Sequence, residues 1–253
     1  MSDIITLGTR METILNDCNN QYFEEYKPYI ISIKSKEILK YVNKMQNSFE
    51  DKIKQLSNYN KILVNVSKEC YIRFNPNLIY SFNDEIHFVF FNSIDFPYLY
   101  NGNINKTITT IVSFITRMFI KEFLSMNIDV DFTCYGKYAI FKNEYEVLNY
   151  LIWRQNDCKR NNIFTLYNYF SKDTLHGKSL DYMNKNLSIY LNKLKLSFDL
   201  RKIIYGNILK KELIYVENKN KELSTKKIIT NNHDILSDNF DENLQKLIYN
   251  RFL

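Results

Sequence analysis

The chain alternates between long stretches in which apolar residues recur every three or four positions and short stretches that are almost wholly apolar. The first pattern is typical of helices that bury one face, and the second of buried strands. Helices are predicted over 5–26, 35–45, 49–66, 106–124, 143–170 and 175–187. Ser35 is the candidate N-cap of the second helix, and a break near Asn161 is an alternative for the fifth. Strands are predicted over 28–33, 71–76, 80–91, 129–136 and 138–141, and a hairpin over 200–233 precedes a capping helix in the last twenty residues.

This order of elements favours an α+β fold in which helices pack on one face of an antiparallel sheet. The chain has 253 residues, which fits one large domain, and its 5 Gly and 3 Pro argue against long flexible linkers. We expect residues 1–190 to form the main domain and residues 191–253 to extend that same domain.

Composition narrows the class of protein without fixing its partner. Hydrophobic residues make up 45% of the chain and charged residues 25%, and the net charge of +6 permits an anionic partner such as RNA. The four cysteines, Cys18, Cys70, Cys134 and Cys158, are far apart and form no CxxC pair, so we expect reduced thiols and no zinc site. We find no signal peptide and no apolar run of membrane-spanning length, and we therefore expect a cytoplasmic protein with no membrane partner.

An acidic pair interrupts the apolar stretch YSFNDEIHFVFF at residues 80–91. Neighbouring residues of a strand point to opposite faces, so at most one of Asp84 and Glu85 faces the core. One interpretation is a surface pair at the end of a strand. The other is that Asp84 helps to hold Mg²⁺ for phosphoryl or nucleotidyl transfer.

The predicted helix 106–124 carries a row of polar residues opposite its apolar face. Lys106, Thr109, Ser113 and Thr116 are spaced by three, four and three positions, which places them on one side of the helix. The row is either a solvated surface or a wall that faces a phosphate group.

The stretch LIWRQNDCKRNN at residues 151–162 places Arg154, Asp157 and Asn161 on one helix face, with Arg160 at its edge. An exposed Arg–Asp pair of this kind adds little stability. Lys159 lies at the same edge as Arg160, and the alternative is that arginine and lysine side chains of this run bind a triphosphate while Asp157 orients an arginine. The LHGKS stretch at 175–179 is by itself only a turn and a helix start, because it lacks the upstream glycine of a P-loop.

Six motifs, in order along most of the chain, resemble those of the tRNA(His) guanylyltransferase family and its guanylyltransferase-like branch. They are LGTRM (7–11), YSFNDEI (80–86), KTITTIVSFITRMF (106–119), VDF (130–132), YLIWRQNDCKRNN (150–162) and LHGKS (175–179). The resemblance implies a palm-like antiparallel sheet related to polymerase and cyclase palms, a tetramer, and two Mg²⁺ ions. It also implies that ATP or GTP activates a tRNA 5′ end, to which a nucleotide is then added in the 3′–5′ direction.

The resemblance assigns roles to named positions. Asp84 and Glu85 fall at the catalytic acids, with Asp84 as a metal ligand. Triphosphate contacts fall at Lys106, Arg154 and Lys178, and Ser113 belongs to the same phosphate-binding set. The supporting positions of the RQxDxxRN motif are Asp157, Arg160 and Asn161.

The first strand departs from the family pattern. Where the family has IxxDGRGFH this chain has PYIISIKSKEILKY, so Lys34 stands in the position of the first metal-binding aspartate and Ser35 in that of the glycine. We therefore expect Asp84 to face Lys34 in a salt bridge that replaces the metal, with Glu37 as an alternative ligand. Three interpretations remain open. The protein is an active nucleotidyltransferase, or it is an impaired relative that binds nucleotide or RNA or partners an active homologue in a mixed tetramer. In the third interpretation, the motifs serve only packing and oligomerisation.

Overall fold

The computed structural model describes residues 6–16, 22–24, 26–35, 37–44, 49–91, 98–171, 177–194, 200–217, 223–232, 236 and 238–244. Its centre is a six-stranded antiparallel sheet of order β4-β1-β3-β2-β5-β6. The strands are β1 (Tyr29–Lys34), β2 (Leu78–Phe82), β3 (Glu85–Phe90), β4 (Tyr135–Ile140), β5 (Asn207–Glu217) and β6 (Leu223–Asn232). The last two strands continue the sheet from β2, so the predicted C-terminal hairpin joins the same sheet as the first four strands.

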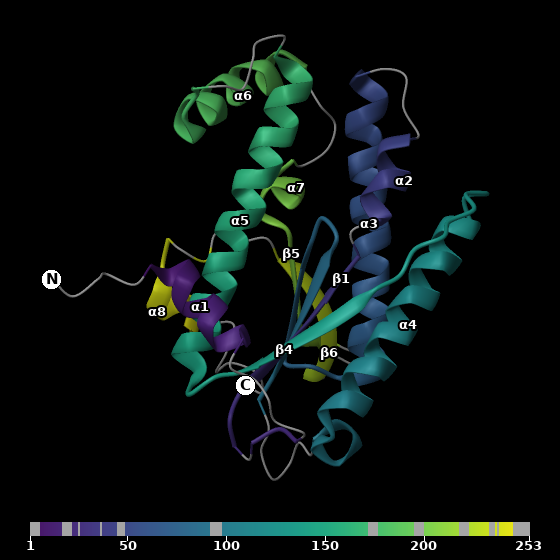
Figure 1. Ribbon diagram of the computed structural model, residues 1–253, viewed down its shortest axis with the longest axis vertical. Helices are drawn as coiled ribbons and strands as arrows, with labels where there is room; N and C mark the ends of the chain where they lie inside the picture. The colour runs from purple at the N-terminus through teal and green to yellow at the C-terminus, as the bar shows by residue number, and fades with distance from the viewer. Residues whose placement is uncertain are drawn as a thin grey trace, which may run out of the picture.

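The helices are α1 (Leu7–Asn16), α2 (Ile38–Lys44), α3 (Phe49–Phe74), α4 (Ile104–Leu124), α5 (Glu144–Phe170), α6 (Leu180–Leu194), α7 (Arg201–Tyr205) and α8 (Phe240–Asn243), with a 3-10 turn at Leu99–Gly102. Figure 1 shows α5 and α1 on one side of the sheet and α3 with α4 on the other. The predicted α+β class and the antiparallel sheet are confirmed. The prediction that helices cover one face only is wrong, because both faces of the strands are apolar and each needs a cover.

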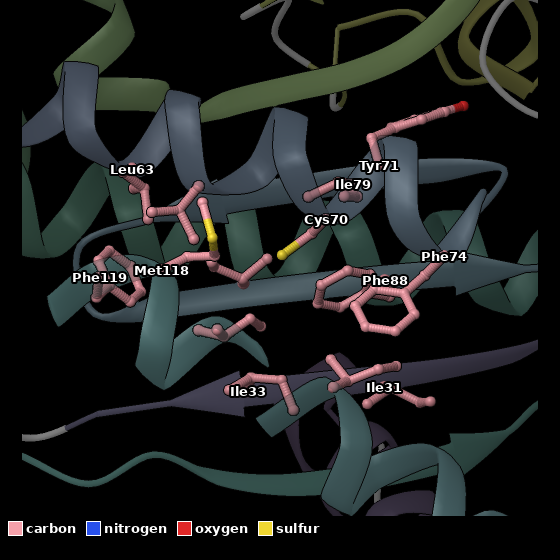
Figure 2. Close-up of a cluster of buried hydrophobic side chains, with 14 of the residues drawn as sticks. Ile31, Ile33, Leu63, Cys70, Tyr71, Phe74, Ile79, Phe88, Met118 and Phe119 are labelled. Carbon is pink, nitrogen blue, oxygen red and sulfur yellow. The ribbon is translucent and has the colours of Figure 1, made fainter. Parts of the chain in front are cut away.

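The core is divided by the sheet into two clusters. On one face, Ile31, Ile33 and Phe88 pack against α3 and α4 (Figure 2). On the other face, Ile30 and Val89 pack against α5 through residues such as Leu148 and Leu151. Adjacent strand residues therefore serve different cores, as the alternation of side chains along a strand requires.

Several predicted boundaries differ from those of the structure. The helix predicted over 49–66 continues to Phe74, so the strand predicted at 71–76 is wrong. The reason is that Cys70, Tyr71 and Phe74 continue the buried helical stripe, which ends just before Asn75, a residue with φ of 47°. The long stretch 80–91 is not a single strand: it contains the end of β2, a turn at Asn83 and Asp84, and β3.

Other boundaries move by a few residues. Residues 129–134 are not in a strand, and only β4 follows them. Helix α2 begins at Ile38, so Ser35 does not cap it, and α5 is continuous through Asn161. Helix α6 begins at Leu180, and Leu175 and His176 lie outside the described residues, as do Cys18 and most of the predicted capping helix.

Candidate functional site

The site is built on one face of the three strands β4, β1 and β3. Lys34 lies opposite Glu85 on one side and Tyr135 on the other, and Ser32 lies opposite His87 and Lys137. Residues that are directly opposite in antiparallel strands project from the same face of the sheet. These six residues therefore form one group, here called the polar patch: Ser32, Lys34, Glu85, His87, Tyr135 and Lys137.

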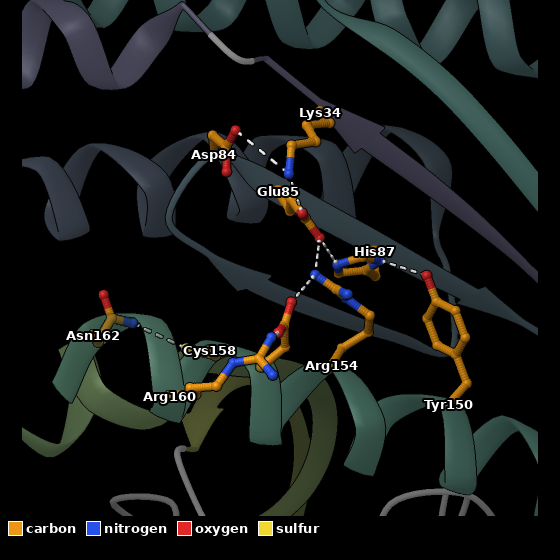
Figure 3. A network of polar contacts seen from close by, with 10 residues as sticks. Lys34, Asp84, Glu85, His87, Tyr150, Arg154, Cys158, Arg160 and Asn162 are labelled. Carbon is orange, nitrogen blue, oxygen red and sulfur yellow. Dashed lines mark hydrogen bonds and ion pairs between the residues drawn. The ribbon is translucent and has the colours of Figure 1, made fainter. Parts of the chain in front are cut away.

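Glu85 is the centre of this patch. Its Oε1 accepts a hydrogen bond from Lys34 Nζ at 2.6 Å, and its Oε2 accepts from Arg154 Nη2 of helix α5 at 2.7 Å. His87 Nε2 lies 3.0 Å from the same Oε2 (Figure 3). The Glu85 side chain is only 9% exposed, so this carboxylate is buried beside the enclosed Arg154 and the half-buried Lys34.

The contacts of His87 define its tautomer. A carboxylate accepts hydrogen bonds only, so His87 Nε2 carries the proton that it shares with Glu85. The other ring nitrogen, Nδ1, then accepts from the Tyr150 hydroxyl at 3.1 Å. A neutral imidazole satisfies both contacts, and burial lowers the pKa of His87 below its usual range, which favours that neutral form.

The two adjacent carboxylates have opposite pKa shifts. Burial alone would raise the pKa of Glu85, but the hydrogen bond from His87, the charge of Arg154 and the hydrogen bond from Lys34 bring it well below its usual range. The pKa of Asp84 is raised, mainly by burial and also by repulsion from Glu85, while the charge of Lys34 opposes that rise in part. Glu85 is therefore held ionised by its partners more firmly than Asp84 is.

Asp84 lies in the turn between β2 and β3. Its Oδ2 is 3.7 Å from Lys34 Nζ, a longer contact than the one between Lys34 and Glu85. Its backbone carbonyl accepts a hydrogen bond from the Ser35 N–H at 3.0 Å, which ties the turn to the end of β1. The expected pairing of Asp84 with Lys34 is present, but the ammonium lies closer to Glu85.

The residues at this position do not fit a pair of divalent cations. Metal pairs of this kind need several carboxylate oxygens, whereas here an ammonium and a guanidinium already bind Glu85. Among the described residues, no group of three or more His, Cys, Asp or Glu side chains could hold a metal ion. Glu37 does not complete a site either: its Oε2 accepts from the Thr133 N–H at 3.3 Å, and no contact with Asp84 or Glu85 is recorded for it among the described residues.

The predicted residues of helix α5 are connected to this network. Asp157 lies between two arginines: its Oδ2 is 3.2 Å from Arg154 Nη2, and its Oδ1 pairs with Arg160. Asn161 is exposed, whereas the neighbouring Asn162 is buried and donates to the Ile203 carbonyl at 2.8 Å. Direct contacts thus connect Arg154, Asp157 and Arg160 to the acidic pair.

The remaining predicted residues have other surroundings. Lys106 is exposed and its Nζ lies 5.4 Å from the centre of the Tyr100 ring. Ser113 is exposed on α4. Lys178 lies beside the rings of Tyr167 and Tyr182, at 5.6 and 5.3 Å from their centres. No contact recorded for the described residues links Lys106 or Ser113 to the polar patch.

A cavity of 360 Å³ opens beside the turn that holds the acidic pair. It lies between α2, α3 and α5, and its lining includes the amides of Asn83, Asn162 and Asn168 and the rings of Phe164 and Tyr169. Among the described residues, the lining holds no charged side chain, and the volume of the cavity falls in the range of small-ligand pockets. Of the five residues named here, Asn83 and Asn162 belong to motifs noted in the sequence.

Sequence reasoning missed His87 and Tyr150, although a signal for each was present. His87 is two residues after Glu85, which places both on one face of a strand. Tyr150 is four residues before Arg154, which places both on one face of a helix. The link between the two residues depends on how α5 packs on the sheet.

Comparison with known proteins extends this description. No family model matches the chain. An uncharacterised protein of Acanthamoeba polyphaga mimivirus is 26% identical over 190 residues, which cover 63% of this chain and 64% of that protein. The match therefore spans a little under two thirds of the relative's length.

Solved structures share the fold across nearly the whole chain. Bacterial tRNA(His) guanylyltransferase-like proteins in complex with ATP and with GTP align over 98% of this chain, and over 100% and 99% of theirs, with TM-scores of 0.63 and 0.62 at 19% and 20% identity. The tRNA(His) guanylyltransferase from Saccharomyces cerevisiae aligns over 83% of this chain and 93% of its own, with a TM-score of 0.55 at 13% identity. The chain has the fold of these proteins.

Across the described residues, none of the helices combines the length and apolar character needed to cross a bilayer.

Proposed function

We propose that this protein is a relative of the tRNA(His) guanylyltransferases that binds a nucleoside triphosphate, or the triphosphorylated 5′ end of an RNA, without a catalytic metal pair. The observation that carries the proposal is the position of Lys34, whose ammonium lies 2.6 Å from Glu85 and 3.7 Å from Asp84. A positive charge at this place repels Mg²⁺ from the carboxylates that would bind it. The same charge attracts phosphate.

The cavity beside the turn supports the nucleotide part of the proposal. Neutral amides such as Asn83 and Asn168 can donate to and accept from the edge of a base, and an aromatic ring such as Tyr169 can stack on it. Asn83 precedes Asp84 directly, so a base in the cavity would direct its phosphates toward the turn and the cations beyond it. Those cations are Lys34, Arg154 and Arg160.

The resemblance supports two further parts of the proposal. The RNA would be a tRNA, whose 5′ end carries the phosphates. The protein would assemble as a tetramer, either alone or with an active homologue. Sedimentation velocity of the purified protein tests the assembly directly, and a single monomeric species at micromolar concentration would contradict it.

Binding is tested by titrating the protein with ATP and with GTP, first in EDTA and then in Mg²⁺. We expect the same affinity in both, because no step of binding uses the metal. Asn168→Leu, which removes an amide from the cavity, should weaken binding by roughly tenfold, an effect of about 1.4 kcal/mol. Asn156→Leu, an exposed position on the same helix outside the cavity, should change it less than roughly twofold.

Catalysis is tested with a 5′-truncated, triphosphorylated tRNA, labelled GTP and Mg²⁺, with extension scored on a denaturing gel. We expect no extension. Extension that is lost in Asp84→Ala would overturn the metal-free proposal. If the unaltered protein binds neither nucleotide, while the Asn168→Leu and Asn156→Leu proteins are both folded, the binding proposal is overturned.

A second candidate is an active nucleotidyltransferase that adds nucleotides to RNA 5′ ends with Mg²⁺ and GTP or ATP. One observation favours it: the 3.7 Å contact leaves Asp84 beyond hydrogen-bond distance of Lys34, so Lys34 does not prevent this carboxylate from binding a metal ion. In that case Lys34 would turn away when the substrate binds, and the gel assay would show extension.

A further inference from the structure

A second and smaller pocket lies over the polar patch. Its volume is 140 Å³, and its lining includes residues of the patch together with Tyr150, Trp153 and Arg154 of helix α5. A single buried water needs roughly 10–15 Å³, and pockets for drug-sized ligands begin near about 300 Å³. The pocket therefore suits a group of a few heavy atoms.

The lining of this pocket has an excess of positive charge. Lys34, Lys137 and Arg154 contribute three positive charges and Glu85 one negative charge, and 3 − 1 leaves a net charge of +2. His87 also lines the pocket and adds no charge in its neutral form. An anion with a charge near −2 would neutralise this lining, and a phosphate group carries about −1.5 to −2 at neutral pH.

Two of the cations retain hydrogen-bond donors for a ligand. The Arg154 side chain is almost fully enclosed, and its Nε is buried without a hydrogen-bond partner among the described residues. Lys137 is exposed at the pocket edge, and no partner is recorded for it within the described part of the chain. The hydrogen bonds of Glu85 go to Lys34, Arg154 Nη2 and His87, and none is recorded to Arg154 Nε or to Lys137 within the described residues.

We propose that this pocket binds a phosphate-sized oxyanion, held between Lys34, Lys137 and Arg154. An arginine at the base and a lysine at the rim match the geometry of phosphate, because the guanidinium donates in a fixed plane and the ammonium acts as a mobile point charge. The anion is either free inorganic phosphate or the terminal phosphate of a larger ligand. The inference rests in part on the proposed function, because Lys34 and Arg154 are the cations assigned there to the phosphates of a nucleotide. Its test is separate, since the 140 Å³ pocket and the 360 Å³ cavity share no lining residue in the described part of the chain.

The test is a titration with inorganic phosphate at constant ionic strength, balanced with chloride and followed by phosphorus NMR or calorimetry. Lys137→Ala is the central variant, because this exposed side chain can be removed without disturbing the core. We expect it to weaken phosphate binding by roughly five- to tenfold, while Lys137→Arg retains most of the affinity. Lys142→Ala removes the same charge from an exposed position outside the pocket and should change the affinity less than roughly twofold.

The outcomes separate the sources of the anion. If ATP competes with phosphate and its affinity also falls in Lys137→Ala, the pocket takes the terminal phosphate of a nucleotide. If phosphate binding depends on Lys137, while ATP does not compete with phosphate and the affinity for ATP does not depend on Lys137, the pocket takes a free oxyanion. That result holds whether or not the protein binds a nucleotide in the 360 Å³ cavity. Absence of phosphate binding to the unaltered protein, or equal losses in Lys137→Ala and Lys142→Ala, would overturn the inference.

Discussion

The two faces of the central sheet are buried by different physical means. On the α3–α4 face, Ile31, Ile33 and Phe88 are covered by apolar side chains, and burial of apolar area supplies the stability. On the α5 face, the strands also present Lys34, Glu85 and His87, which are covered by Arg154 and Tyr150. The same β1 and β3 strands take part in both.

The difference shows where function can be placed on this fold. The apolar face depends on shape and volume, so each of its residues is costly to change. The polar face depends on matched partners: Glu85 is stable there only because Lys34, Arg154 and His87 satisfy it. The Glu85 carboxylate therefore has its cationic partners within the protein, while the lining around it keeps an excess of positive charge.

The largest effect is expected on the apolar face. Phe88 is fully buried and packs against Phe74, and Phe88→Ala should lower the free energy of unfolding by about 3–5 kcal/mol. Chemical denaturation measures it. Ile72→Ala, an exposed position on α3, serves as the control and should change stability by less than about 0.5 kcal/mol. A loss below about 1 kcal/mol for Phe88→Ala would mean that this face is not the main core.

Glu85→Gln should produce a smaller loss, of about 2–3 kcal/mol, because it leaves Lys34 and Arg154 beside a neutral group. The triple variant Lys34→Met, Glu85→Leu, Arg154→Met should be more stable than Glu85→Gln, since it removes both cations together with the carboxylate that they share. Recovery stays incomplete because Asp84 and Asp157 each lose a cationic partner. Denaturation of both variants checks this. If the triple variant is less stable than Glu85→Gln, the two faces do not differ in the way described.

Acid should weaken the polar face in particular. The pKa of Glu85 is lowered in the folded protein, so its stabilising contribution is present above its ordinary value of 4.5 and is lost as the pH falls below that value. Between pH 5 and pH 3 we expect the unaltered protein to lose about 2 kcal/mol more than Glu85→Gln does. The raised pKa of Asp84 acts in the opposite direction in both proteins. Parallel stability curves for the two proteins would contradict the prediction.

The smallest effect tests the replacement of the metal by the ammonium. Lys34→Asp exchanges a positive for a negative charge beside Asp84 and Glu85, and should create Mg²⁺ binding that the unaltered protein lacks. At a Mg²⁺ concentration ten times the dissociation constant, the gain in stability is about 1.4 kcal/mol, visible as a rise in melting temperature. Lys40→Asp makes the same charge change at an exposed position of α2 and should gain nothing. An unchanged response to Mg²⁺ in Lys34→Asp would argue against Lys34 as the substitute for a metal.

The sequence alone determined the elements whose burial pattern is long and regular. The apolar spacing of 106–124 and 143–170 predicted α4 and α5 closely, because a buried stripe over many turns has one consistent period. It also placed Arg154 and Asp157 on one helix face, as their 3.2 Å contact confirms. Short segments such as 71–76 were mistaken, because a few apolar residues fit a strand and a helix end equally well.

Only the tertiary structure decided which carboxylate of the acidic pair meets the lysine. Asp84 and Glu85 are adjacent, and local sequence does not say which of them faces the sheet surface that α5 covers. That choice depends on the register between β1 and β3, which pairs Lys34 with Glu85 and leaves Asp84 in the turn. Register is fixed by the turn at Asn83 and by the burial of both sheet faces, since a shift of one residue would exchange every side chain between the two cores.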